Sequence, residues 1–166
     1  MAEAETLWTV VPDEVEEKTR DVLERACVQE LTLATAESCT GGMVASLLTD
    51  VPGASHAFER GFVTYTDEAK AEMLGVPIGL VKEKGAVSAE VASAMVQGAL
   101  DHSTADVAVS ITGFAGEGQE PGLVYFACAR RGGEARVREE HFGDIGRGRI
   151  RVECMRVAVD MLVEMI

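Results

Sequence analysis

Two nearly continuous apolar runs, "ADVAVSITG" (residues 105–113) and "GLVYFACAR" (residues 122–130), constrain the fold of this chain more than any other feature. A strand with one face in water alternates apolar and polar residues, whereas these runs have no regular polar face. They are typical of strands that are buried on both faces at the centre of a sheet. Helices must then cover both sides of that sheet.

Segments with helical and strand periodicity alternate along the rest of the chain. We predict helices over residues 13–27, 43–48, 67–75, 88–102 and 146–166, and further strands over residues 31–36, 61–66 and 134–142. Asp13 and Asp67 are the expected N-caps of the first and third helices. This alternation predicts an α/β fold, a three-layer α/β/α sandwich with a mixed, mostly parallel sheet. Residues 1–12 are expected to be a flexible N-terminal arm and residues 13–166 a single domain.

The charge of the chain limits its partners. The 166 residues carry a formal net charge of -13, so long-range repulsion argues against nucleic acid or an anionic membrane as the main partner. The sequence has no apolar run of about 18 residues and no signal-peptide pattern, and we expect a cytoplasmic protein. Its four cysteines are scattered, without a C-x-x-C pair. We therefore expect reduced thiols and no metal site.

The stretch "AESCTGG" (residues 36–42) is the first candidate for chemistry, because it lies between a predicted strand and a predicted helix. In open α/β sheets, ligands bind beyond the carboxyl ends of strands, where helix N-termini offer unpaired amides. Gly41 and Gly42 would let a ligand approach the backbone, and the amides of residues 39–42 could stabilise a phosphate or an oxyanion. The competing interpretation is that Ser38 or Thr40 simply caps the helix.

Three possible nucleophiles stand in this stretch, namely Ser38, Cys39 and Thr40. A reactive Cys39 needs a base such as histidine, and no histidine of the chain lies in a recognisable partner motif. A lysine that loses its proton can instead activate a hydroxyl group. Lys70 in "YTDEAK" is the candidate, because the start of a helix disfavours an ammonium group. It must also be buried, and the alternative is an ordinary exposed lysine.

Two further stretches could complete a pocket. The glycine-rich "SITGFAGEGQEPG" follows a buried strand and places Thr112 and Gly113 where backbone amides could wrap an anion, although a plain turn fits equally well. "GDIGRGRIR" gathers basic residues in an acidic chain. On a helix, Arg147 and Arg151 share one face, a geometry that suits a phosphate clamp, with surface ion pairs as the alternative.

These motifs resemble those of a known family. "TAESCTGG", "ERGFVTYTDEAKAEMLGV", "KGAVS", "SITGFAG" and the pattern R-x-x-I-R occur in the order and spacing of the C-terminal domain of the competence/damage-inducible protein CinA. The resemblance runs from Asp13 to Ile166. Stand-alone members of that family include nicotinamide mononucleotide deamidases.

The resemblance implies an amidohydrolase that converts nicotinamide mononucleotide and water to nicotinate mononucleotide and ammonia, in pyridine nucleotide salvage. Ser38 resembles the nucleophile and Lys70 the base, with Tyr65 close to both. The substrate-binding candidates are Cys39, Thr40, Gly41, Gly42, Thr112, Gly113, Arg147 and Arg151. The resemblance implies no cofactor, a small-molecule nucleotide as the partner, and a homodimer.

The sequence departs from the family pattern in the loop that follows "SITGFAG". Glu117 stands where the family usually has proline, and "EGQEPG" is shorter than the family loop and lacks its lysine. This departure bears on the binding of the substrate phosphate more than on the fold. The alternative function is therefore a catalytically inactive or altered-substrate member that binds a nucleotide or a protein in competence or the DNA-damage response.

Overall fold

A computed structural model of the chain describes residues 11–54, 56–116 and 118–166. The predicted N-terminal arm, residues 1–12, therefore lies almost wholly outside the described residues, and Glu117 lies outside them as well. Within the described residues, no helix is both long enough and apolar enough to cross a membrane.

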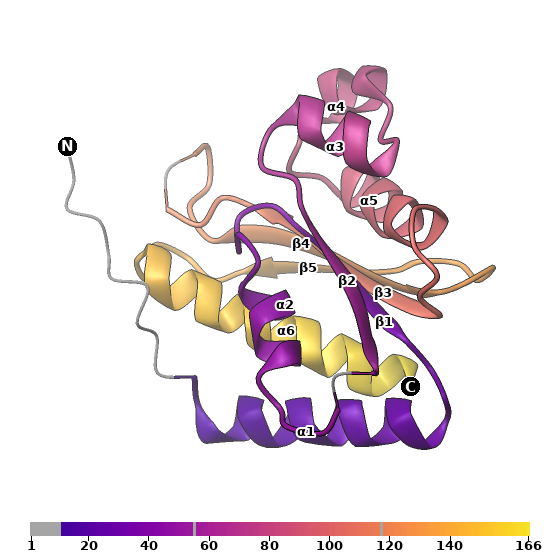
Figure 1. Cartoon of the computed structure of the whole chain (residues 1–166). Helices are drawn as coiled ribbons and strands as arrows, with labels where there is room; N and C mark the ends of the chain where they lie inside the picture. The colour runs from indigo at the N-terminus through magenta and orange to yellow at the C-terminus, as the bar shows by residue number, and fades with distance from the viewer. Residues whose placement is uncertain (1–10, 55, 117) are drawn as a thin grey trace.

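The described strands form one five-stranded mixed sheet (Figure 1). They are β1 (Leu33–Glu37), β2 (Phe58–Val63), β3 (Val107–Gly113), β4 (Leu123–Arg130) and β5 (Arg136–His141), in the spatial order β2-β1-β3-β4-β5. β1 pairs in parallel with both β2 and β3, whereas β4 pairs antiparallel with β3 and β5. Only β4 runs against the other strands of this sheet, and the predicted mixed, mostly parallel sheet is confirmed.

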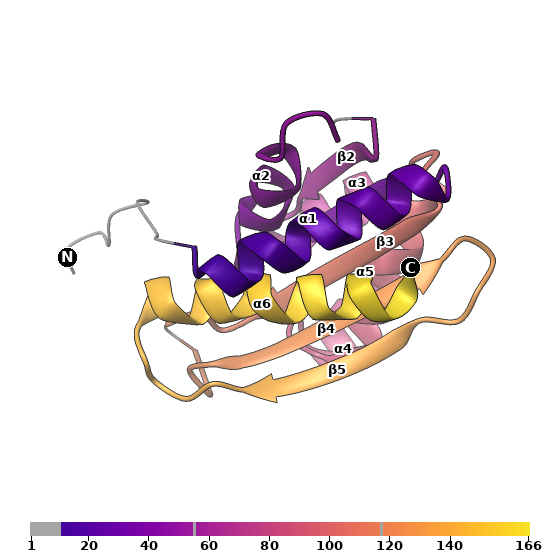
Figure 2. The same cartoon turned by 90° about the horizontal axis from the view of Figure 1, so that it is seen from below.

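Helices cover both faces of the sheet, as the apolar strands require (Figures 1 and 2). One face carries α1 (Asp13–Val28), α2 (Met43–Thr49) and α6 (Arg147–Met165), and the other carries α3 (Asp67–Leu74), α4 (Ile78–Lys84) and α5 (Ala89–Asp101). The predicted α/β/α sandwich is therefore confirmed.

The two faces of the sheet carry side chains of different size. Toward α1 and α6 they are large, with Val109 and Phe126 among them, whereas toward α5 most are alanines such as Ala108. Small side chains let α5 lie close to the sheet. α5 also packs closely against α3 at Gly98, where a Cβ atom would collide with the carbonyl oxygen of Leu74.

Four local predictions were wrong. Pro12 rather than Asp13 is the N-cap of α1, and Asp13 is the first residue of that helix. β2 ends at Val63 rather than Thr66, and Thr66 itself is the N-cap of α3, since its hydroxyl oxygen accepts a hydrogen bond from the amide of Ala69 at 3.1 Å. Asp67 is therefore the first residue of α3 and not its cap. The seven-residue helix α4 was not predicted, because it buries only Val81 and so has no apolar period to detect.

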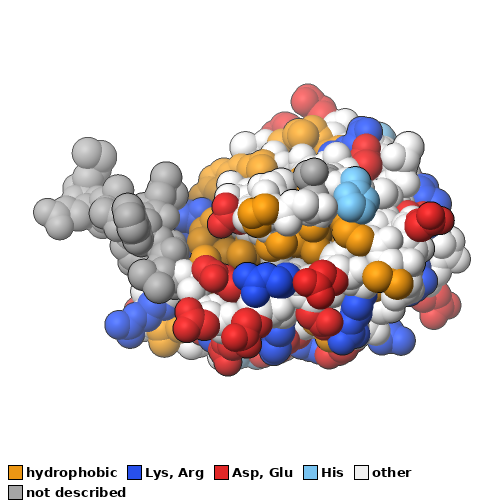
Figure 3. Space-filling view, turned by 60° about the horizontal axis from the view of Figure 1, so that its bottom comes forward, with side chains coloured by type: hydrophobic (Ala, Val, Ile, Leu, Met, Phe, Trp, Pro, Cys, Tyr) orange, Lys and Arg blue, Asp and Glu red, His pale blue; other side chains and the backbone are white. Residues whose placement is uncertain are grey.

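Acidic and basic side chains lie interspersed on the face that carries α1 (Figure 3). Several pair with each other, including Lys18 with Asp160 and Arg156 with Glu14. These cations are therefore paired within the protein.

Candidate active site

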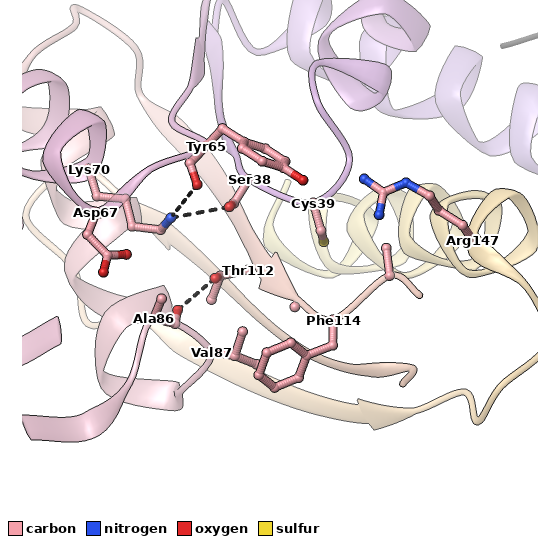
Figure 4. A pocket seen from close by; sticks show the side chains of 12 residues that line it. Ser38, Cys39, Tyr65, Asp67, Lys70, Ala86, Val87, Thr112, Phe114 and Arg147 are labelled. Atoms are coloured by element: carbon pink, nitrogen blue, oxygen red, sulfur yellow. Dashed lines mark hydrogen bonds between the residues drawn. The ribbon is translucent and has the colours of Figure 1, made fainter. Parts of the chain in front are cut away.

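A cavity of about 240 Å³ opens at the carboxyl ends of β1 and β3, where an open α/β sheet most often binds ligands (Figure 4). Seven of its lining residues are among the predicted site residues, namely Ser38, Cys39, Tyr65, Lys70, Thr112, Gly113 and Arg147. The other lining residues are Asp67, Ala86, Val87, Phe114 and Ala115. The fold thus brings together segments that are more than a hundred residues apart in sequence.

The centre of the cavity is a contact between Ser38 and Lys70. The Nζ atom of Lys70 lies 3.2 Å from the Oγ atom of Ser38 and also donates to the carbonyl oxygens of Thr64 at 3.1 Å and Tyr65 at 3.5 Å. A neutral amine has two hydrogens and one lone pair. With both hydrogens on the two carbonyls, the lone pair is left for the hydroxyl hydrogen of Ser38, which is the arrangement that a general base requires.

The predicted burial of Lys70 is confirmed, because its side chain is only 1% exposed. Burial lowers the pKa of the Lys70 amine, since the charged form loses its hydration. The negative charge of Asp67 and the nearby Cys39 thiol act in the opposite direction and raise that pKa. Burial has the larger effect, so the neutral form of Lys70 is favoured relative to a lysine in water.

The ring of Tyr65 lies at the rim of the cavity, with 63% of the residue exposed. The chain leaves β2 at Val63, and the next two carbonyl groups turn toward Lys70. Tyr65 therefore contacts Lys70 through its backbone, while its phenol group remains available to a ligand (Figure 4).

The turn between β1 and α2 lacks the side-chain cap that one interpretation of its sequence predicted. Neither Ser38 nor Thr40 caps α2, because the N-cap is Gly42 with a φ of 95° and no side-chain cap. Instead, the carboxylate of Glu37 accepts a hydrogen bond from the amide of Gly42 at 3.2 Å. The amide of Gly41 donates to the carbonyl oxygen of Ser38 at 3.1 Å. Two of the four amides predicted for the ligand are therefore already engaged.

Cys39 lines the cavity beside Ser38 and is 6% exposed. A hydrogen bond with the thiol of Cys154 on α6 lowers the pKa of Cys39, while burial opposes this effect. The pKa of Cys154 is raised well above its usual value, chiefly by burial, so Cys39 is the more acidic thiol of the pair. No histidine is among the lining residues that the structure describes.

Thr112 and Gly113 end β3 at the edge of the cavity. The hydroxyl group of Thr112 donates to the carbonyl oxygen of Ala86 at 2.7 Å, which ties β3 to the segment before α5. A Cβ atom at Gly113 would collide with Val124, so only glycine fits there without a shift. These two residues lie beside the turn at Ser38, because β1 and β3 are paired and the amide of Ser38 donates to the carbonyl oxygen of Ile111.

The prediction that Arg147 and Arg151 clamp one ligand together is corrected. Arg147 lines the cavity at the first residue of α6, on the other side of Cys39 from Lys70 (Figure 4). Arg151 does not line it, because its Nη2 atom donates to the carbonyl oxygen of Thr40 at 2.8 Å. Helical spacing correctly predicts that Arg147 and Arg151 share one face of α6. That face contacts the cavity at Arg147 and the turn after β1 at Arg151.

The model of the CinA C-terminal domain family matches residues 15–166 of this chain. The chain belongs to the CinA family. A CinA-like protein from Akkermansia muciniphila is 56% identical over 125 residues, which are 69% of this chain and 30% of that protein. A CinA-like protein from Geobacter metallireducens is 48% identical over 138 residues, which are 80% of this chain and 33% of that protein. The CinA-type domain thus spans about a third of the length of these relatives.

Solved structures agree with the family and the fold. The competence/damage inducible protein CihA from Agrobacterium tumefaciens superposes with a TM-score of 0.91 at 41% identity, covering 95% of this chain and 98% of that one. A CinA superfamily protein from Escherichia coli gives a TM-score of 0.87 at 32% identity, covering 98% of this chain and 96% of that one.

Three residues that line or support the cavity were not predicted from the sequence. Asp67 and Phe114 line the cavity, and both stand inside motifs that had been noted for their neighbours. Glu37 is fully buried behind the turn. The signal for Glu37 was its position directly before Ser38 at the end of an apolar strand, where a carboxylate needs several donors.

Proposed function

We propose that this CinA-type domain is an amidohydrolase that converts nicotinamide mononucleotide and water to nicotinate mononucleotide and ammonia. The observation that carries the proposal is the 3.2 Å contact between the Oγ atom of Ser38 and the Nζ atom of Lys70, at a lysine that is 1% exposed. A buried amine with a lowered pKa beside a hydroxyl group is the device by which a lysine activates a serine.

The first step is attack on the carboxamide. Neutral Lys70 takes the hydroxyl proton of Ser38 while the Oγ atom of Ser38 bonds to the carboxamide carbon. The carbonyl oxygen becomes an oxyanion in the tetrahedral intermediate. The amides of Cys39 and Thr40 donate no hydrogen bond to the backbone of another described residue, although the Cys39 amide contacts its own thiol. These two amides are the proposed donors to that oxyanion.

The second step releases ammonia and then the acid. Lys70, now an ammonium group, returns its proton to the leaving nitrogen as the carbon–nitrogen bond breaks, which leaves an ester on Ser38. Lys70 is then neutral again and takes a proton from water, which attacks the ester carbon. Transfer of that proton to the Oγ atom of Ser38 releases nicotinate mononucleotide and restores the enzyme. This mechanism calls for no metal or cofactor.

The walls of the cavity support a nucleotide with an aromatic amide. Tyr65 and Phe114 contribute aromatic rings to the lining of the cavity. Arg147 stands at the N-terminus of α6, where the helix dipole also favours an anion. The proposal therefore assigns the substrate phosphate to Arg147. It retains the expectation of a cytoplasmic homodimer that acts on a small molecule.

The test measures ammonia and nicotinate mononucleotide together, from purified protein and nicotinamide mononucleotide. Ser38→Ala and Lys70→Ala should each lower turnover by about a hundredfold or more. Lys82→Ala, which changes an exposed lysine of α4, is the matched control and should leave turnover unchanged. Absence of product from the folded parent protein would refute the assignment.

The engagement of Arg151 by Thr40 favours one alternative, a CinA-type domain that binds a different ligand or lacks catalysis. It leaves a single arginine among the described lining residues of this cavity. Such a domain would keep its ligand affinity in Ser38→Ala and Lys70→Ala. Calorimetry of the parent protein with nicotinamide mononucleotide, run beside the ammonia assay, separates this alternative from the enzyme, because a non-catalytic domain binds a nucleotide without releasing ammonia.

A further inference from the structure

We propose that Glu37 is a positioning residue that holds the turn after β1 in the shape that aims the amides of Cys39 and Thr40 at the oxyanion. The proposal rests on the proposed function, because the oxyanion forms when Ser38 attacks a carbonyl carbon. Glu37 itself does not line the cavity and acts only through the turn.

The carboxylate of Glu37 makes four hydrogen bonds while fully buried. Its Oε2 atom accepts from the hydroxyl group of Thr40 at 2.7 Å and from the amides of Gly42 at 3.2 Å and Val44 at 3.0 Å, and its Oε1 atom accepts from the amide of Ala45 at 2.8 Å. A buried carboxylate persists only when such donors compensate its lost hydration. These contacts join the turn after β1, which contains Ser38 and Thr40, to the start of α2.

Thr40 is held from two sides. Its hydroxyl group donates to Glu37, and its carbonyl oxygen accepts from Arg151 on α6 at 2.8 Å. The orientation of the peptide groups around Thr40 is therefore set by a carboxylate on one side and a guanidinium group on the other. The amide that directly follows a nucleophile is a common oxyanion donor, and here that amide belongs to Cys39.

A simpler role for Glu37 would be to cap α2, and one contact separates the two roles. The amides of Val44 and Ala45 belong to α2, whereas the hydroxyl group of Thr40 belongs to the turn. Thr40→Val keeps the shape of the side chain and removes only the turn contact. If Glu37 only caps α2, this change should hardly affect catalysis. If Glu37 positions the amides of the turn, this change should lower the catalytic rate.

The experiment measures two rates for each variant, namely hydrolysis of nicotinamide mononucleotide and the burst of acylation by the activated ester p-nitrophenyl acetate. We expect Thr40→Val to lower both rates by about tenfold or more, with KM for the nucleotide little changed. The variant also loses one hydrogen bond to a buried carboxylate, so its midpoint of urea unfolding should fall, and both rates are measured without urea, where the variant is folded. Thr40→Ser restores the hydroxyl group and should restore both rates. Thr49→Val removes an exposed hydroxyl contact at the end of α2 and is the matched control.

The two assays separate failure of this proposal from failure of the proposed function. A parent protein that is acylated by the ester but leaves nicotinamide mononucleotide intact refutes the substrate, and the ester burst of Thr40→Val still tests the positioning role. Rates within twofold of the parent protein for Thr40→Val would overturn the proposal. If the parent protein is inactive in both assays, the proposed function and the positioning role of Glu37 are both overturned. Glu37→Gln should resemble Thr40→Val if it folds, but the conclusion does not depend on it.

Discussion

Replacing Lys70 by methionine keeps the apolar stem of the side chain and removes its amine. Among the described hydrogen bonds, the amine of Lys70 is the side-chain group that contacts the Oγ atom of Ser38. In the proposed cycle, this amine accepts and returns the proton in each step. A lost general base costs about a hundredfold or more in rate, which corresponds to about 2.7 kcal/mol or more in the barrier. We expect Lys70→Met to lose turnover by at least that factor.

The same substitution changes how stability depends on pH. The unfolded chain holds the Lys70 proton up to a pKa near 10.5, whereas burial lowers the pKa of the folded state. Between the lowered pKa and 10.5 the unfolded state binds more protons, so the free energy of unfolding of the parent protein rises with pH, by at most about 1.36 kcal/mol per pH unit. This contribution is lost as the pH falls through the folded-state pKa, and Lys70→Met lacks it.

The assay is urea unfolding followed by circular dichroism for the parent protein and Lys70→Met, at several pH values from 7 to 10. Groups that titrate alike in both proteins cancel in the difference. We expect the stability of the parent protein relative to the variant to increase as the pH rises. A difference that stays flat, together with retained turnover in the variant, would refute a buried amine with a lowered pKa as the base.

Three further predictions follow from single residues of the structure. Cys39→Ala should keep turnover within about tenfold of the parent protein, because the proposed nucleophile is a hydroxyl group, and a loss as large as that of a nucleophile variant would instead support a thiol enzyme. Arg147→Ala should raise KM for the nucleotide by about tenfold or more but leave the unphosphorylated riboside unaffected; equal effects on both would exclude a phosphate contact. Gly98→Ala should destabilise the fold by about 2 kcal/mol, through its collision with Leu74, in thermal or urea unfolding. Gly79→Ala, with nothing within 4 Å, is its control, and equal stabilities would contradict the close approach of α3 and α5.

Much of the fold could be predicted, because burial of a central strand leaves a direct trace in the sequence. The runs that became β3 and β4 are apolar along both faces, and only a sheet covered on two sides accommodates them. Element ends were less predictable. The end of β2 depends on the carbonyl contacts of Lys70, and α4 depends on its packing beside α5, neither of which is visible in local periodicity.

The lining of the cavity could be predicted where a motif and a physical requirement agreed. Ser38 and Lys70 meet as expected, since the motif placed both at the carboxyl edge of the sheet and a base required burial. The role of Arg151 was predicted wrongly, because helical spacing does not say what a helix face packs against. Glu37 was missed for another reason. Its place at the end of an apolar strand was a signal that it needs donors, but its four donors come together only when the turn folds.

The most direct test of the account is to trap the covalent intermediate. The parent protein is mixed with nicotinamide mononucleotide, quenched in acid within milliseconds to seconds, digested and analysed by mass spectrometry. The Ser38–Lys70 mechanism predicts a nicotinate mononucleotide ester on the peptide that contains Ser38, absent from Ser38→Ala and reduced in Lys70→Met. Steady release of ammonia with an adduct on Cys39, or with no adduct under any quench time, would contradict the Ser38–Lys70 mechanism.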